Sequence, residues 1–527
     1  MGKKSNIIIR YWRLLCRPSS VALGIIGSFI RSRLMTRLIY SPLIILALFP
    51  ASLLHAENAH NPSATPDTEI QTPEESPSNS QFPSHIPRAR WSEDWSRLRR
   101  EGSNENGDLL PFKHVELDVD SNNYLSFGGE YRFTYERYDD QARGLSDIGK
   151  QDVLLHRFAG HADWYLSKNW RIFTQLGFAK AEGREGGHKA GDESDLNVWQ
   201  FFVDKRITLD AKDERIDIRV GRQFIEKYNW LVGAGEARNI RQYYDGVRVA
   251  WLEKGFAKVD VYAAEFVDAD EDSFSMEGTD EYFWGANTEL LYDDFNVNLL
   301  YLGWDLKDLQ FEHGGGGRHD EKRHTAILRL YRPATLQRQF VFDSYLIYQF
   351  GDYDDAKNSD IKAFATFGEI KYALHSQIKT PMIGIKAGYF SGDDDPDDNT
   401  LKTFFDPIFV TPYFSYARDV MPYNLIHLQP NVGYRFSSKL QATLSNDFLW
   451  RAEKSDAFYT GASAIGINAS DSDDSYIGSQ QQLSINWVAS RQVVISSHLV
   501  HFDAGDVVED GGGENQWYAH FGFSFMF

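Results

Sequence analysis

The chain has 527 residues, of which 25% are charged, 42% hydrophobic and 14% aromatic, and its formal net charge is −20. So many aromatic residues in so polar a chain argue against a soluble core and favour a barrel with aromatic girdles around a wet lumen. The only cysteine is Cys16, so a chain that loses its first 56 residues has neither disulfides nor cysteine-based zinc sites.

The first 56 residues form a basic leader. They hold eight Lys or Arg and no Asp or Glu, and the rest of the chain has 47 basic and 75 acidic residues, a net charge of −28. An apolar run over 38–54 ends at Leu54-His55-Ala56, which is typical of a secretory signal peptide; the alternative is a transmembrane anchor. Met35 is a second candidate for the true start. No later segment approaches the roughly 20 apolar residues of a membrane helix, so any further membrane segment would be a barrel.

Residues 57–90 hold six prolines among Ser, Asn, Thr and Glu. This composition cannot bury a core and predicts a disordered periplasmic linker. We therefore expect three parts: a leader over 1–56, a linker over 57–90 and a barrel over 91–527.

Alternation with a period of two begins near residue 123. Leu125, Phe127 and Tyr131 share one parity, whereas Glu130 and Arg132 take the other, as in a strand between lipid and water. The pattern repeats to the end of the chain and predicts an all-β, transmembrane antiparallel barrel of about 18 strands. The predicted strands are 123–138, 152–167, 169–182, 195–209, 215–223, 241–252, 256–267, 281–292, 295–306, 322–332, 337–350, 360–374, 379–391, 424–436, 439–452, 475–489, 491–504 and 516–527.

The connections between these strands are alternately short and long, as in barrels with short periplasmic turns and long extracellular loops. An even strand count places both ends of the barrel in the periplasm. The last strand carries Phe521, Phe523, Phe525 and Phe527 on one face and resembles the outer-membrane assembly signal; a buried edge strand of a soluble sandwich is the alternative. The predicted location is the bacterial outer membrane, in contact with lipid and lipopolysaccharide.

Residues 215–248 form a basic segment, with seven Lys or Arg and four Asp or Glu in an otherwise acidic chain. Arg219 and Arg248 have the polar parity of their strands, which predicts that they face the lumen. Arg222 breaks the alternation, which indicates either a bulge at Gly221 or a position above the lipid zone.

Several motifs in residues 90 to about 250 resemble the alginate export porins. That resemblance implies an 18-stranded, monomeric outer-membrane barrel whose arginine-lined constriction passes an anionic polysaccharide. The stretch Trp230–Ala237 departs from the Ser- and Arg-rich pattern of the family and adds Glu236, which leaves the substrate open. The matching motifs are Arg90–Trp95, Leu125–Arg132, His161–Asp163, Gln200–Asp204, Val220–Gln223, Arg238–Arg241 and Tyr244–Arg248.

Charge compensation is what a polyuronate needs in a narrow pore of low dielectric. Guanidinium groups keep their proton and bind carboxylates with two hydrogen bonds, and nearby acids such as Glu130 and Asp163 would hold them in place. Ordinary lumen salt-bridge ladders are the alternative explanation. The candidate path residues are Arg132, Arg157, Asp204, Arg219, Arg222, Arg238, Asn239, Arg241 and Arg248.

Three functions remain open from the sequence. The first is outward passage of an alginate-like polysaccharide, with periplasmic export machinery as a possible partner. The second is selective uptake of small acidic solutes. The third, an outer-membrane enzyme, is not expected, because no catalytic motif is recognised; neither a cofactor, a catalytic site, a metal site nor a nucleic acid partner is predicted. The acidic runs Asp268–Asp272, Asp352–Asp355, Asp393–Asp398 and Asp471–Asp474 are expected to be solvated loops rather than calcium sites.

Overall fold

The computed structural model describes only part of the chain, all of it within the compact unit Ser63–Phe527. The predicted leader lies outside the described residues, as does the predicted linker except for Arg90. The described residues are 90–93, 95, 112–118, 123–146, 148–187, 189, 191–209, 214–225, 231–232, 238–253, 255–268, 278–333, 338–375, 379–409, 411–461 and 464–527.

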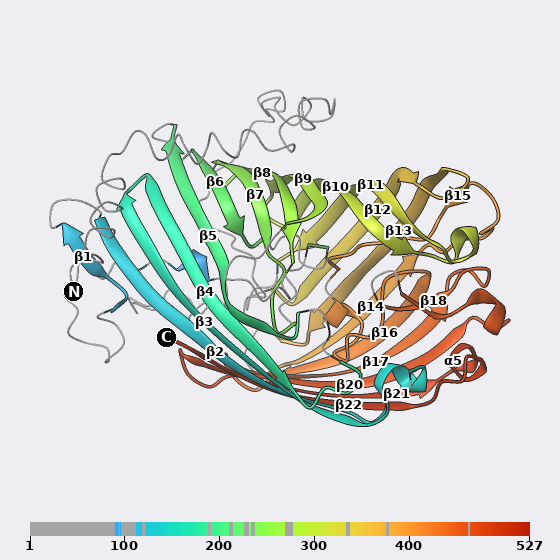
Figure 1. Ribbon diagram of the computed structural model, residues 1–527. Helices are drawn as coiled ribbons and strands as arrows, with labels where there is room; N and C mark the ends of the chain where they lie inside the picture. The colour runs from blue at the N-terminus through green and yellow to red at the C-terminus, as the bar shows by residue number, and fades with distance from the viewer. Residues whose placement is uncertain are drawn as a thin grey trace, which may run out of the picture. The chain divides into compact units, whose positions relative to one another are not determined.

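Eighteen antiparallel strands form the barrel wall, each paired with the next. The last, β22, pairs with the first, β2, and closes the barrel (Figure 1). The predicted fold class is therefore confirmed. The strands are β2 (Asn123–Tyr138), β3 (Gln151–Ser167), β4 (Trp170–Glu182), β5 (Ser194–Thr208), β6 (Arg215–Gln223), β7 (Tyr244–Glu253), β8 (Ala257–Val267), β9 (Gly278–Leu291), β10 (Asn296–Gln310), β11 (Arg318–Arg332), β12 (Phe340–Tyr353), β13 (Ser359–Ala373), β14 (Pro381–Phe390), β16 (Leu425–Arg435), β17 (Leu440–Arg451), β20 (Tyr476–Val488), β21 (Val493–Ala504) and β22 (Gln516–Met526).

Smaller elements lie beside the wall. Strand β1 (Val115–Asp118) pairs with β2, and β15 (Thr400–Leu401) runs parallel to β13. A separate hairpin joins β18 (Phe458–Gly461) to β19 (Ala464–Ile467). The helical turns are η3 (Arg90–Ser92), η5 (Gln141–Gly144), η6 (His313–Gly315), η7 (Thr411–Tyr413), η8 (Ala469–Asp471) and α5 (Asp506–Asp510).

The two faces of the wall follow the period-two pattern. On β12, Tyr345, Ile347 and Gln349 are buried, whereas Leu346 and Tyr348 are 51% and 50% exposed. Successive side chains of a strand point to opposite faces, so the first set faces the lumen and the second faces outward. An apolar outer face is the arrangement of a barrel in a bilayer. None of the described helices is long and apolar enough to cross a membrane.

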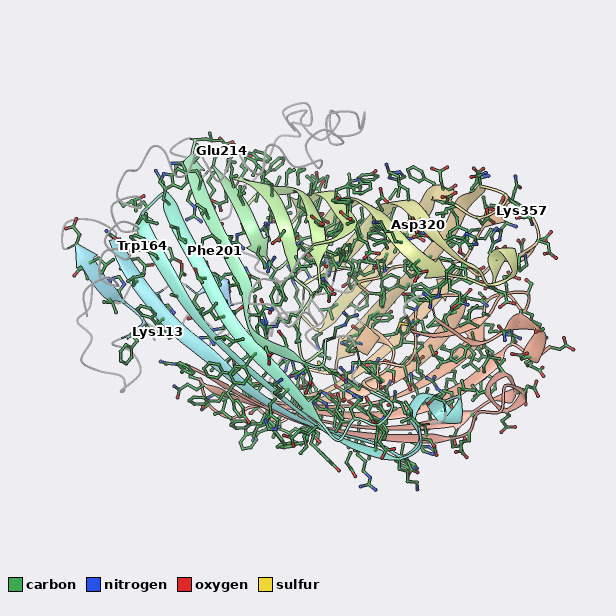
Figure 2. The ribbon with its side chains drawn as sticks, viewed as in Figure 1. Lys113, Trp164, Phe201, Glu214, Asp320 and Lys357 are labelled. Carbon is green, nitrogen blue, oxygen red and sulfur yellow. The ribbon has the colours of Figure 1, made fainter. Side chains whose placement is uncertain are left out.

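The two ends of the barrel differ in their connections. At one end, β3 runs into β4 and β16 into β17 through a few residues, and Lys113 lies near this end; at the other end lie the long connections and Lys357 (Figure 2). Trp164 and Phe201 mark the outer face, where both rings are exposed. Alternating short and long connections were predicted from the sequence.

Described residues of two long connections pack inside the barrel. The 391–424 loop joins β14 to β16, and its Phe404, Phe405, Phe409 and Phe414 are buried in the main hydrophobic cluster together with inward-facing wall residues. The 224–243 loop joins β6 to β7 and contributes its own buried side chains to that cluster. Strand β7 begins at Tyr244 rather than at the predicted residue 241, so Arg241 belongs to this loop.

Candidate functional site

The first group of candidate residues surrounds Glu130 on the inner face of β2. The guanidinium of Arg157, on β3, donates a hydrogen bond of 2.5 Å to a Glu130 carboxylate oxygen. Arg241, from the 224–243 loop, lies 3.6 Å from the other Glu130 oxygen. Arg132 is directly opposite Arg157 in the β2–β3 ladder. All four side chains are buried, so this group joins the 224–243 loop to the wall.

Asn239 fixes the same loop through its side-chain amide. Its Nδ2 lies 3.1 Å from the His156 carbonyl, 3.2 Å from that of Lys180 and 2.8 Å from that of Asp192. These carbonyls belong to β3, β4 and the connection before β5. Since the residue is almost fully buried, Asn239 is a structural bridge in this conformation.

The second group is a ladder of alternating charges along β4, β5 and β6. Arg219 donates two hydrogen bonds, of 2.7 and 2.9 Å, to the Asp204 carboxylate, and its guanidinium lies 3.7 Å from the Phe202 ring centroid. Arg171 donates to Asp163 at 2.6 and 2.7 Å and lies 3.6 Å from Asp204. Carboxylates that accept such paired hydrogen bonds hold guanidiniums in fixed orientations.

Arg248 extends this ladder on β7. It is directly opposite Arg219 in the β6–β7 pairing and donates a 2.8 Å hydrogen bond to Asp260 on β8. The side chains of Arg219 and Arg248 are 11% and 21% exposed. These two inward-facing side chains are therefore partly exposed while their carboxylate partners hold them in place.

Arg222 lies on the outer face. Its Cα partner on β5 is Phe201, which is 45% exposed and points away from the lumen (Figure 2). Its guanidinium binds the Asp245 carboxylate at 2.9 and 2.8 Å. No register shift separates Arg222 from its two neighbouring strands, so its parity alone carries it outside. This placement corrects the prediction that Arg222 lines the path.

Arg238 is exposed, unlike Asn239 and Arg241 in the same loop. Its charge acts on Tyr423 of the 391–424 loop, where burial and the Asp406 carboxylate raise the pKa of the tyrosine and Arg238 acts in the opposite direction. Arg238 is therefore the exposed candidate residue of this loop.

The 391–424 loop is held by polar contacts at several points. Arg323 donates to the Thr403 carbonyl at 2.9 Å, and Gln349 donates to that of Phe405 at 2.8 Å. Arg418 pairs with Glu136 on β2. The loop joins β14 to β16, and these contacts attach it to β11 and β12 on one side and to β2 on the other. The loop is therefore a fixed part of the lumen interior.

Two residues of this site were not singled out in the sequence. Arg171 has the inward parity of its predicted strand, as Asp163 and Asp204 do, so strand parity was a signal that could have found it. Glu136 also has inward parity on β2, but its partner Arg418 lies 282 positions later. Local periodicity carries no information about such a contact.

An arrangement of Asp393, His313 and Ser359 has the shape of a hydrolase triad. His313 Nδ1 lies 2.6 Å from an Asp393 carboxylate oxygen, and its Nε2 lies 2.9 Å from the Ser359 hydroxyl. All three are fully buried, and the Ser359 hydroxyl also lies 2.9 Å from the Asp355 carboxylate. A nucleophile must be reachable by substrate, so this is a tie between loops. It also shows that Asp355 and Asp393 are not solvated as predicted.

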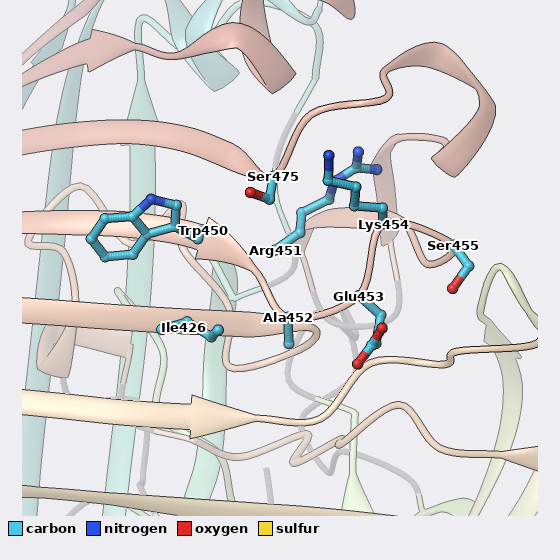
Figure 3. A pocket seen from close by; sticks show the side chains of 8 residues that line it. All are labelled: Ile426, Trp450, Arg451, Ala452, Glu453, Lys454, Ser455 and Ser475. Atoms are coloured by element: carbon cyan, nitrogen blue, oxygen red, sulfur yellow. The ribbon is translucent and has the colours of Figure 1, made fainter.

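A metal centre and an anion-binding cavity would be two further kinds of site in the described part of the chain. Among the described residues no group of three His, Cys, Asp or Glu is arranged to hold a metal ion. A cavity of about 670 Å³ lies where β17 ends (Figure 3). Its two cations are engaged by main-chain oxygens, Lys454 with Asp473 and Arg451 with Ser472 at 2.7 Å. This cavity therefore presents no cation directed at an anionic ligand.

The fold is shared with solved outer-membrane porins. OccAB1 of Acinetobacter baumannii superimposes with a TM-score of 0.51 at 12% identity, over 77% of this chain and 98% of that one. OpdK of Pseudomonas aeruginosa, solved with vanillate, gives 0.50 at 10% identity, over 76% and 98%. Such low identity shows the fold alone.

The sequence comparison gives the family. No curated protein matches the chain, but the family model described as alginate export matches residues 123–521. That range covers the barrel wall from β2 into β22 and includes every candidate residue. The chain therefore belongs to the alginate export family, and it is a non-enzymatic β-barrel channel of the bacterial outer membrane.

Proposed function

We propose that this channel passes an anionic polysaccharide of the alginate type outward, along a path that includes Arg219, Arg248 and Arg238. The observation that carries the proposal is the opposed pair Arg219 and Arg248, which is inward-facing, partly exposed and held by Asp204 and Asp260. A polymer with one carboxylate per sugar meets guanidiniums already oriented for two-point binding.

The aspartates have a second role in this proposal. Each accessible arginine of the ladder already has a carboxylate partner, so a passing carboxylate exchanges with Asp204 or Asp260 rather than meeting a bare cation. Conduction requires sites that bind favourably but weakly enough to release. Exchange of carboxylates lowers the net gain at each site and suits a polymer that must keep moving.

The remaining candidates have a supporting role. Arg157, Arg241 and Asn239 are buried and hold the 224–243 loop against the wall, with Arg132 beside them. In the proposed mechanism these residues set the position of Arg238 and the width of the path. They do not themselves touch the polymer.

A second candidate function is selective uptake of small acidic solutes. The packing of both the 224–243 and 391–424 loops inside the barrel favours it, because a narrowed lumen suits a small solute better than a chain. The same arginine ladder would serve either substrate. Outward passage of a polymer requires that the 391–424 loop leaves room for an extended chain.

The test is a planar-bilayer measurement of reversal potential and conductance with and without polyuronate. Wild type should be anion-selective and blocked by polyuronate, and Arg219→Gln should weaken the block by about tenfold, the worth of roughly one charged hydrogen bond. Arg222→Gln is the matched control on the outer face and should behave as wild type. Cation selectivity with no block would contradict the proposal.

Block by monomeric uronate alone would favour the uptake function. The direction is tested in cells: loss of an exporter should leave acidic polymer in the periplasm, whereas loss of an uptake porin should slow growth on a small acidic solute.

A further inference from the structure

The seam between β2 and β22 is incomplete at its short-turn end. The two strands pair from Glu130↔Met526 to Tyr138↔Tyr518, and main-chain hydrogen bonds add Gly129 and Phe527, so residues 123–128 of β2 extend beyond this pairing. Strand β1 covers part of that edge through Val115↔Leu125 and Glu116↔Tyr124. An open strand edge is a weak point in a barrel.

Arg90 bridges the seam from the lumen side. Its Nη1 donates a 2.5 Å hydrogen bond to the Gly129 carbonyl of β2, and its Nη2 donates a 2.7 Å bond to the Phe527 main-chain oxygen just after β22. One guanidinium thus binds acceptors on both sides of the closing pair. The side chain is fully buried, so water competes poorly for these bonds.

Lys113 and Glu93 complete the arrangement. Lys113 Nζ donates to the same Phe527 oxygen at 2.9 Å and to a Glu93 carboxylate oxygen at 3.1 Å. Glu93 also accepts from Arg90 and, at 2.6 Å, from the Trp95 indole. A buried carboxylate with three donors fixes the two cations that point at the seam. We name Arg90, Glu93, Trp95 and Lys113 the seam clamp.

Two glycines make room for this contact. A Cβ on Gly128 would lie 2.4 Å from Lys113 Nζ and 2.6 Å from the Phe527 oxygen, and one on Gly129 would lie 2.4 Å from the Phe527 ring. The wall therefore carries no side chain at Gly128 and Gly129, where Lys113 and Phe527 approach it. Main-chain bonds of 2.9 Å join Gly129 and Phe527 in both directions.

We propose that the seam clamp stabilises barrel closure, so that the Arg90–Trp95 motif acts in assembly rather than in transport. The bonds from Arg90 and Lys113 to the Phe527 oxygen can form only when β22 has reached its closed register beside β2. These two bonds therefore add stability to the closed ring and none to an open one.

The test uses the full chain with Cys16→Ser, refolded into detergent, and Arg90→Lys, which keeps the charge but cannot span two acceptors as the planar fork does. The temperature at which the compact gel band converts to the unfolded band should fall by about 5 °C or more. Arg329→Lys is the control, since that buried arginine binds Asp343 away from the seam at 2.7 and 2.8 Å. A control loss equal to that of Arg90→Lys would overturn the proposal.

A disulfide across the seam distinguishes an effect on barrel closure from an effect on general stability. Tyr135 and Phe521 are directly opposite across the seam, within the range of Cα distances that a disulfide spans. We combine Arg90→Lys with the double substitution Tyr135→Cys and Phe521→Cys. When the disulfide is oxidised, most of the fall in unfolding temperature caused by Arg90→Lys should disappear, and reduction should restore it. The proposal is overturned if Arg90→Lys has no effect, or if its effect is the same in both redox states. If Arg90→Lys does not refold when reduced, refolding under oxidising conditions supports the clamp, and failure there overturns it.

Discussion

Arg219 and Arg248 lie directly opposite each other in the β6–β7 ladder, yet each guanidinium binds a carboxylate on the strand beyond, Asp204 on β5 and Asp260 on β8. Like charges in opposed positions destabilise a sheet. The repulsion between these two arginines is offset because Asp204 and Asp260, which lie outside the pair, each bind one of the guanidiniums. Four strands are therefore needed to present two cations to one part of the lumen.

The first prediction concerns Asp204. Asp204→Asn removes the main partner of Arg219 and leaves that guanidinium more available, so block by polyuronate should strengthen and anion selectivity should increase. We expect an affinity gain of roughly fivefold to tenfold, about 1–1.4 kcal/mol. Planar-bilayer recordings with added polyuronate measure it. Asp245→Asn is the matched control, because Asp245 binds Arg222 on the outer face; an equal gain there would contradict the assignment.

The second prediction concerns the position of the 224–243 loop. Asn239→Ala removes the side-chain contacts to three main-chain carbonyls, which should cost about 1–3 kcal/mol of local stability. Trypsin should then cleave faster after Arg238 or Arg241, and current recordings should become noisier. Asn446→Ala is the control, since Asn446 bonds Gln481 across two strands far from this loop. Unchanged cleavage in Asn239→Ala would show that other contacts fix the loop.

The third prediction concerns the aromatic part of the 391–424 loop. Replacing residues 404–416 with a short Gly-Ser linker removes the side chains packed inside the barrel, so single-channel conductance should rise toward that of an open barrel of 18 strands. The same replacement at residues 509–512, at the end of α5 in the connection between β21 and β22, should leave the conductance unchanged. Equal conductance in both variants would mean that the path bypasses the 391–424 loop.

The fourth prediction is a pH dependence at Asp456, which lies in the connection after β17. Burial raises the pKa of Asp456 to about 6, although Thr403, Tyr459 and two main-chain amides donate to it. The folded state therefore holds the proton more tightly than the unfolded state. Loop stability should be greatest below about pH 4 and fall as pH rises to about 6, by at most roughly 3 kcal/mol.

Hydrogen exchange of the 400–409 and 456–461 amides, corrected for intrinsic rates, measures this dependence. Asp456→Ala should exchange faster throughout but lose the pH dependence between 4 and 6. A dependence that persists in Asp456→Ala would assign it to another group.

The barrel wall was predictable because alternation is a local property. The predicted bounds of β2 and β6 match the structure, since each residue's face depends only on its neighbours in the strand. Arg222 shows the limit of this reasoning. Its parity already pointed outward, and the local positive charge of residues 215–248, together with the likeness of its motif to a family pattern, placed it among the path candidates. In the structure Arg222 binds Asp245, which lies 23 positions later in the chain and also faces outward.

The interior was less predictable. The 391–424 loop has no periodicity, and its place inside the barrel depends on contacts with strands from β2 to β20. The candidates around Glu130 were chosen as path residues, but the structure brings them together as a buried tie for the 224–243 loop. Charge and parity predict that a residue faces inward; they do not predict whether another segment covers it.

One carbonyl of the 391–424 loop has an unusual set of partners. The Phe414 oxygen lies 3.3 Å from the side-chain amide of Gln429, 3.1 Å from that of Gln480 and 2.6 Å from that of Gln482. Amides neither titrate nor attract counterions. At this point the loop is therefore attached independently of ionic strength, while the arginine ladder weakens as salt rises. Rising ionic strength would therefore leave this attachment of the loop unchanged while it reduces the attraction of the arginine ladder for anions.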